Sequence, residues 1–109
     1  MKIKKQKLPK AFKTKWVKAL RSGKYEQYTE GGLHSVSNNS YCCLGVAGHI
    51  CGVDNSELRR YGYLTDIKNN KIPKLIQGEK ENPVVDKLTE FNDNGKSFKW
   101  IASYIERYL

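Results

Sequence analysis

YCCLGVAGHICG, at residues 41–52, is the least ordinary segment of this chain, with two adjacent cysteines, a third cysteine and three glycines. As a helix, it would set its glycines on one stripe at the i, i+3, i+7 spacing, at Gly45, Gly48 and Gly52. A second, apolar face would then carry Cys43, Ala47, Ile50 and Cys51. Free cysteine packs as a small hydrophobe, and glycine lets another backbone come close at a cost of about 1 kcal/mol against alanine. We therefore predict a buried, closely packed helix here.

Zinc binding is the first alternative use of this segment, because possible ligands gather at His34, Cys42, Cys43, His49 and Cys51. Structural zinc needs four converging donors, usually from pairs separated by two to four residues, and the spacing H-x7-C-C-x5-H-x-C contains no such pair. A helix would set Cys43 and Cys51 about 12 Å apart along its axis. A strand would point Cys42 and Cys43 to opposite faces. We predict no structural metal, and no cofactor is expected.

The three cysteines are also poorly placed for disulfides. Adjacent residues have Cα atoms about 3.8 Å apart, below the roughly 4.4 Å that ordinary bridges need. On a helix, Cys51 lies too far from either partner, and an odd cysteine count argues against a closed framework. We expect free thiols in a reducing compartment. A cysteine enzyme or metal protein stays an alternative, with Cys42 or Cys43 as nucleophile. His34 or His49 would then be the base, although no residue is visibly placed to orient either imidazole.

Positive charge is concentrated at the start of the chain. The net charge is +9, and residues 1–24 hold ten basic residues and no acidic ones, so the rest of the chain is almost balanced. Such a field attracts nucleic acid, nucleotides, acidic protein faces or anionic lipid. A solubilising basic tail is the plainer interpretation of the same charge.

The remaining pattern predicts an α+β fold with about four helices packed against a short β-hairpin. Apolar residues recur at helical spacing after Leu8, again from Pro83 to Phe91, and again from Ser97 to Leu109. SNNS at residues 37–40 is typical of a hairpin turn. Asn82 and Ser97 are expected to cap their helices. Residues 53–82, between the cysteine-rich segment and the helix that starts at Pro83, are poorly patterned. Their expected core anchors are Tyr61, Tyr63, Leu64, Ile67, Ile72, Leu75 and Ile76.

We divide the chain into a flexible basic arm at residues 1–7 and a single globular domain at residues 8–109. No apolar run approaches the roughly 18–20 residues that span a bilayer. The lysine-rich start lacks the apolar segment of a signal peptide. A cytoplasmic protein without a membrane partner is therefore expected.

Three blocks of this sequence resemble a family of small phage and prophage proteins. They are WVKALRSGKYEQ at 16–27, YCCLGV at 41–46 and LTEFNDNGKSFKWIASYIE at 88–106. The family often has a Cys-Asp pair directly after the second block, where this chain has Ala47-Gly48-His49. The resemblance implies a phage accessory protein that acts in the cytoplasm of a bacterial host, and it implies no catalytic residues.

These observations favour a non-enzymatic binding protein that antagonises a host process, such as a defence system. It would sequester an anionic nucleotide-type ligand or block a nucleic-acid-handling complex. The expected ligand contacts are Lys10, Lys13, Lys18, Arg21, Lys24 and Tyr25. The backbone amides of the LRSGKY turn are expected to contribute as well. Trp100 and Tyr104, with Tyr108, form an aromatic stripe that would stack bases or meet a partner. The alternative for this stripe is packing against Phe12 and Trp16.

A second hypothesis is a nucleic-acid binder of low sequence specificity that uses the basic arm and first helix. A host protein is a further possible partner, and a homo-oligomer is left open.

Overall fold

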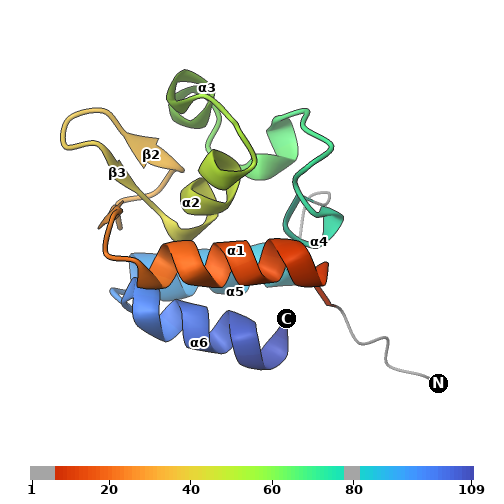
Figure 1. The fold of residues 1–109 in the computed structure, drawn as a ribbon. Coiled ribbons are helices and arrows are strands. Elements are labelled where there is room, and N and C mark those ends of the chain that lie inside the picture. Colours follow the sequence, from red (N-terminus) through yellow and green to blue (C-terminus); the bar gives the residue numbers. More distant parts are fainter. Residues whose placement is uncertain (1–6, 78–81) are drawn as a thin grey trace.

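Helices dominate the part of the chain that the computed structural model describes, residues 7–77 and 82–109 (Figure 1). The α-helices are α1 (Lys10–Arg21), α2 (Cys43–Ile50), α3 (Asn55–Arg60), α4 (Lys74–Gln77), α5 (Pro83–Asp93) and α6 (Phe98–Tyr108). A 3₁₀ turn, η1 (Leu64–Asp66), and the strands β1 (Glu26–Gln27), β2 (His34–Ser35) and β3 (Ser40–Tyr41) complete the fold. The predicted α+β class is confirmed, and α1, α2, α5 and α6 are the four predicted helices. Residues 1–6 of the predicted arm lie outside the described residues.

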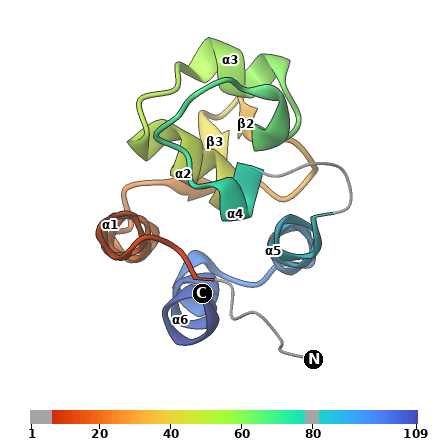
Figure 2. The same cartoon turned by 90° about the vertical axis from the view of Figure 1, so that its right-hand side faces the viewer.

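Helices pack against α2 from two sides. Figure 2 shows α1, α5 and α6 as a triangle, with α2 and the sheet above it. α1 packs against α6 and α2, while α5 packs against α2, α4 and α6. On the far side, α3 contacts α2 and β2. α6 therefore lies at the outer surface, between α1 on one flank and α5 on the other (Figure 2).

The sheet contains the predicted hairpin and one strand that the sequence did not predict. β2 and β3 pair antiparallel, with His34 opposite Tyr41. The turn between them contains Asn39, whose φ of 50° is a left-handed conformation that asparagine tolerates. β1 adds to the other side of β3 in parallel.

α2 is the buried helix that its sequence predicts. Residues from Cys43 to Gly48 are all buried, and a Cβ at Gly45 would collide with the carbonyl oxygen of Leu33. At Gly48, a Cβ would lie 2.8 Å from a methyl group of Leu58. Gly52 was expected in the same packing stripe, and this is wrong. It has open space around it and a φ of +90°, so it ends the helix instead of admitting a neighbour.

Three side chains cap the helix starts. Asn82 accepts hydrogen bonds from Val84 and Val85, and Ser97 accepts one from Trp100, as predicted. Cys42 caps α2 through its sulfur, which accepts from the Gly45 amide at 3.3 Å.

The region between α2 and α5 is held by most of the predicted anchors, including the partly buried Tyr61 and Leu75, and by others that the sequence did not predict. Leu64, Ile67, Ile72 and Ile76 are buried as expected, but Tyr63 is 56% exposed, so its assignment to the core is wrong. Leu58 in α3, which the sequence did not predict as an anchor, is fully buried. Among residues 7–77 and 82–109, no helix is long and apolar enough to cross a membrane.

Candidate anion-binding groove

An open groove of about 730 Å³ runs along α1 on the flank that faces α6. Its lining is mostly basic: Lys10, Lys13, Thr14, Val17, Lys18, Arg21, Ser22, Lys24 and Glu106. The volume lies within the range of small-ligand sites. Five of the eight predicted contact residues therefore meet in one place, namely the four lysines and Arg21.

The helical repeat of α1 explains this gathering. Residues three, four and seven apart share one face of a helix, which aligns Lys10 with Thr14, Val17 and Arg21. The adjoining face buries Trp16 and Leu20, with Val17 buried at its boundary with the groove, and the indole N–H of Trp16 donates to the carbonyl of Cys43 at 3.0 Å. Since these contacts fix how α1 is rotated, the lysines are directed outward.

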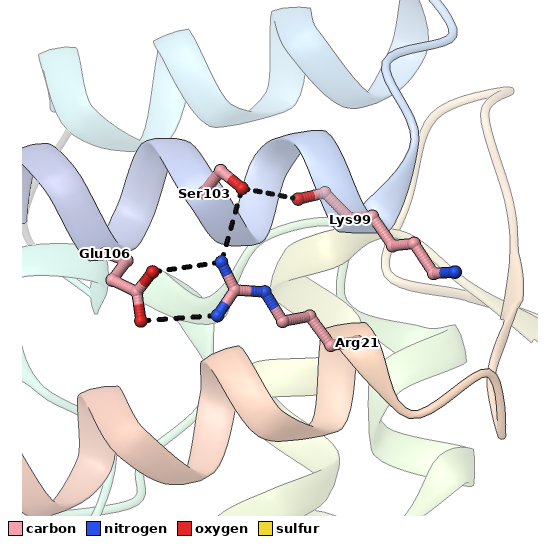
Figure 3. Close-up of polar contacts among 4 residues, drawn as sticks. All are labelled: Arg21, Lys99, Ser103 and Glu106. Carbon is pink, nitrogen blue, oxygen red and sulfur yellow. Dashed lines mark hydrogen bonds and ion pairs between the residues drawn. The ribbon is translucent and has the colours of Figure 1, made fainter.

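Arg21 is engaged across the groove, as Figure 3 shows. Its two terminal nitrogens donate to both carboxylate oxygens of Glu106, at 3.0 and 3.2 Å, and one also donates to the hydroxyl of Ser103 at 3.3 Å. This hydrogen-bonded pair holds the pKa of the Glu106 carboxyl below its ordinary value. Arg21 was predicted as a ligand contact, and it would have to share its guanidinium between Glu106 and a bound anion.

The turn after α1 uses its backbone amides internally. Gly23 has a φ of +77°. The Lys24 amide donates to the hydroxyl of Ser22, and the Ser22 amide donates to the carbonyl of Ala19. The amides of Ser22 and Lys24 are therefore not available to a phosphate, contrary to our expectation for the LRSGKY turn.

Tyr25 lies apart from the groove in a cluster of rings. Its ring contacts those of Tyr41 and His49, with centroid distances of 5.2 and 5.4 Å. Burial raises the pKa of the Tyr25 hydroxyl, and burial together with His34 lowers the pKa of His49. The Tyr41 hydroxyl donates to Asn55 at 3.0 Å. Tyr25 thus belongs to the packing between β3 and α2.

Trp100 and Tyr104 lie on the other flank of α6. Both contact Phe91 of α5, with ring centroids 4.8 and 4.9 Å apart. The alternative that they pack against Phe12 and Trp16 is wrong in its partner, because the ring that both contact is Phe91 of α5. The basic groove and the aromatic stripe are therefore two separate surfaces.

Comparison with known proteins identifies a family that matches more than half of this chain. The family described as Domain of unknown function (DUF8296) matches residues 8–71, more than half of the chain. The chain belongs to the DUF8296 family. No curated protein and no solved structure matches it. The DUF8296 segment contains all the basic residues of the groove, whereas Glu106, Trp100 and Tyr104 lie outside the matched segment.

The DUF8296 segment also contains the three thiols, which are free and buried. Burial raises the pKa of Cys42 to about 11 and that of Cys43 well above its ordinary value. Burial also raises the pKa of Cys51. Nucleophilic cysteines need a lowered pKa, so these environments disfavour thiolate chemistry. The described residues contain no group of three or more His, Cys, Asp or Glu side chains that could hold a metal.

Sequence reasoning missed Glu106 as part of the groove. Its partner, Arg21, is 85 residues away, so no local spacing connects them. A signal was available in the position of Glu106 on α6, because it lies outside both the apolar face and the aromatic stripe. That position predicts a residue on the polar flank of α6, but not which helix this flank faces.

Proposed function

We propose that this DUF8296 protein is a non-enzymatic accessory protein that binds a phosphate-bearing ligand in the α1 groove. One observation carries the proposal: five cationic side chains line a single groove whose one acidic lining residue, Glu106, is already paired with Arg21. Clustered cations raise the local concentration of anions and bind phosphate through charge-assisted hydrogen bonds.

A nucleotide-type ligand suits the groove better than a simple ion. The methyl of Thr14 and the edge of the largely buried Val17 give the lining some apolar surface between the lysines, against which a base or sugar could pack while phosphates meet the cations. Ligand pockets generally combine such apolar area with a few polar groups. A small protein that binds a nucleotide without converting it would act by sequestration.

The biological setting is part of the same proposal. The resemblance to small phage and prophage proteins suggests an accessory protein in the cytoplasm of an infected bacterium. Removing an anionic signal from a host defence system is a role that needs affinity and abundance but no catalytic residue.

Nucleic acid of low sequence specificity is the second candidate ligand. It is favoured by the length of the basic surface, because the twelve residues of α1 span about 18 Å at 1.5 Å per residue. Double-stranded DNA presents a phosphate about every 1.7 Å of its axis, so α1 could meet several phosphates at once. This candidate predicts binding that weakens steeply with salt.

The test compares two charge-matched triple variants in calorimetric titrations with a nucleoside triphosphate, a cyclic dinucleotide and a random DNA duplex. Lys10→Gln, Lys13→Gln and Lys18→Gln together remove three groove charges. Lys15→Gln, Lys68→Gln and Lys74→Gln remove three charges outside the groove lining. We expect the groove variant to bind the preferred nucleotide at least about tenfold more weakly than the control variant.

The outcomes separate the candidates. Tight binding of a nucleotide at about 200 mM salt supports sequestration, while binding only to duplex, lost between about 50 and 200 mM salt, supports the second candidate. Equal weakening in both triple variants would show a general charge effect and contradict a groove site. So would a wild-type protein that binds none of the three probes.

A further inference from the structure

A ladder of four aromatic rings follows the flank of α6 that faces α5. Phe91 packs edge-on against Trp100 and Tyr104, Trp100 and Tyr104 lie nearly parallel with an 11° interplanar angle, and Tyr104 contacts Tyr108 at 4.9 Å. On α6 these rings recur every four residues, which corresponds to about 6 Å along the axis. We call Phe91, Trp100, Tyr104 and Tyr108 the aromatic ladder.

The ladder is anchored on one side and open on the other. Phe91 and Tyr104 are half-buried and pack against the core, whereas Trp100 is 40% exposed and Tyr108 is 59% exposed. The described part of the chain has four strongly exposed large hydrophobic side chains, and two of them lie on this ladder. Since the core is already closed beneath them, the outer rings are not needed there.

Cations border the outer rings. The Lys96 ammonium lies 4.8 Å from the centroid of Trp100, and the Arg107 guanidinium carbon lies 5.7 Å from that of Tyr108. Lys87 is four residues before Phe91, so it lies on the same side of α5. The acidic side chains of α5, Asp86, Glu90 and Asp93, fall 100° or more around the helix from Phe91 at 100° per residue. The ladder therefore offers flat rings within a positive border.

This combination identifies the chemistry of a partner. An anionic partner with flat apolar faces would satisfy both the cations and the rings, and unpaired nucleobases on a phosphate backbone have these properties. A duplex hides its base faces inside the stack. A second copy of this chain, packed through the same flank, would bring like charges together.

We propose that the aromatic ladder binds single-stranded nucleic acid, with unpaired bases stacking on Trp100 and Tyr108. Lys96 and Arg107 cover these rings in the free protein. When a base takes the ring face, their long side chains turn to the adjacent phosphates. This surface is distinct from the α1 groove, which lies on the opposite flank of α6 (Figure 2).

Tryptophan fluorescence reads this surface directly. The chain has two tryptophans, and Trp16 is fully buried and hydrogen-bonded to Cys43, so quenching by a bound base reports Trp100. We expect a twelve-nucleotide oligothymidylate to quench this emission. A duplex of the same length and polyglutamate should leave it nearly unchanged. Equal quenching by polyglutamate would overturn the proposal in favour of an acidic protein partner.

Matched ring deletions then locate the contact. Tyr108→Ala and Trp100→Ala should each weaken binding of a labelled oligothymidylate about tenfold, as loss of one base–ring stack does elsewhere. Tyr63→Ala removes a ring that is about as exposed as Tyr108 but lies outside the aromatic ladder, and it should have no effect. Thermal melts would verify that all three variants fold.

Two outcomes would refute the inference outright: an equal loss in Tyr63→Ala, or equal affinity for duplex and single strand. A wild-type sedimentation coefficient that rises with protein concentration and falls to the monomer value in Tyr108→Ala would assign the ladder to self-association instead. The groove variant with Lys10, Lys13 and Lys18 changed to Gln should bind oligothymidylate as well as its charge-matched control. The proposal for the aromatic ladder and the proposal for the groove can thus be contradicted independently of each other.

Discussion

α1 and α2 lie against each other, but they differ in almost every physical respect. In α2, the residues from Cys43 to Gly48 are buried, and Asn92, which is itself buried, accepts from the first amide of the helix. In α1, one face packs on α2 and α6 while the other carries exposed lysines along an open groove. The adjacent cysteines and the glycines of α2 are unusual in composition, whereas the lysines of α1 stand out by their charge alone.

The comparison teaches that unusual composition and function need not coincide. The thiols of α2 have raised pKa values and internal partners: Cys42 caps the helix, and Cys43 donates to the carbonyl of Leu88 at 3.6 Å. These residues make the helix small enough to fit its site. The lysines of the α1 groove are free of such internal roles, and this is where we propose that a ligand binds.

The largest loss of stability is expected from a substitution in α2, at Gly45. A methyl group at this position would collide with the backbone carbonyl of Leu33, which also accepts the Cys42 amide. Backbone cannot move aside as a side chain can, so Gly45→Ala should lower the free energy of unfolding by about 3 kcal/mol or more. Urea denaturation followed by circular dichroism measures this.

Gly62→Ala is the matched control, because Gly62 has open space around it and no positive φ. Its effect should stay within about 1 kcal/mol and could be stabilising. Similar losses at Gly45 and Gly62 would show that α2 is not closely packed against the backbone of Leu33.

Asn92 is the next test, because it joins α5 to both α2 and β1. Its side-chain oxygen accepts from Gln27 and from the Cys43 amide, and its nitrogen donates to the carbonyl of Tyr28. Asn92→Ala would leave a buried amide and a carbonyl without partners, at a cost of about 3 kcal/mol in the same denaturation assay. Asn70→Ala, at an exposed position, should cost less than about 0.5 kcal/mol.

The limits of sequence reasoning follow from the same residues. Helical spacing and the caps at Asn82 and Ser97 predicted the four long helices, because these signals are local. β1 is two residues long and depends on Asn92, 65 residues away from Gln27, so no local pattern marks it. Leu58 is the one buried residue of α3, and a single apolar residue gives no periodicity.

The candidate site also combines features that local spacing predicts with features that depend on long-range packing. Spacing along α1 was sufficient to place its lysines outside the apolar stripe, and the structure gathers Lys10, Lys13 and Lys18 in the groove. The pairing of Arg21 with Glu106, and the separation of Trp100 from the groove, depend on how α6 is rotated between its two neighbours. Tertiary packing sets that rotation, so the sequence of either helix alone does not predict it.

A moderate effect is expected from the pH dependence of stability. The ordinary thiol pKa is about 9, and burial raises that of Cys42 to about 11 in the folded protein. The unfolded chain then loses this proton first, so stability falls as pH rises from about 9 to about 11. Each pKa unit corresponds to about 1.4 kcal/mol, giving at most about 3 kcal/mol at the upper end. Cys42→Ala should show a shallower decline in urea denaturation over this range, and an unchanged slope would contradict a buried, protonated thiol.

The smallest effect concerns the α1 side, where Glu106 competes with a ligand for Arg21. Both side chains of this pair are substantially exposed, so Glu106→Gln should change stability little. It removes the one carboxylate from the groove and frees the Arg21 guanidinium, so nucleotide affinity should rise about two- to fivefold in calorimetric titration. Glu57→Gln makes the same charge change on α3 and should leave affinity unchanged. If Glu106→Gln weakens binding instead, the ion pair itself holds Arg21 in its binding geometry, and the carboxylate is then part of the groove's function, not a competitor.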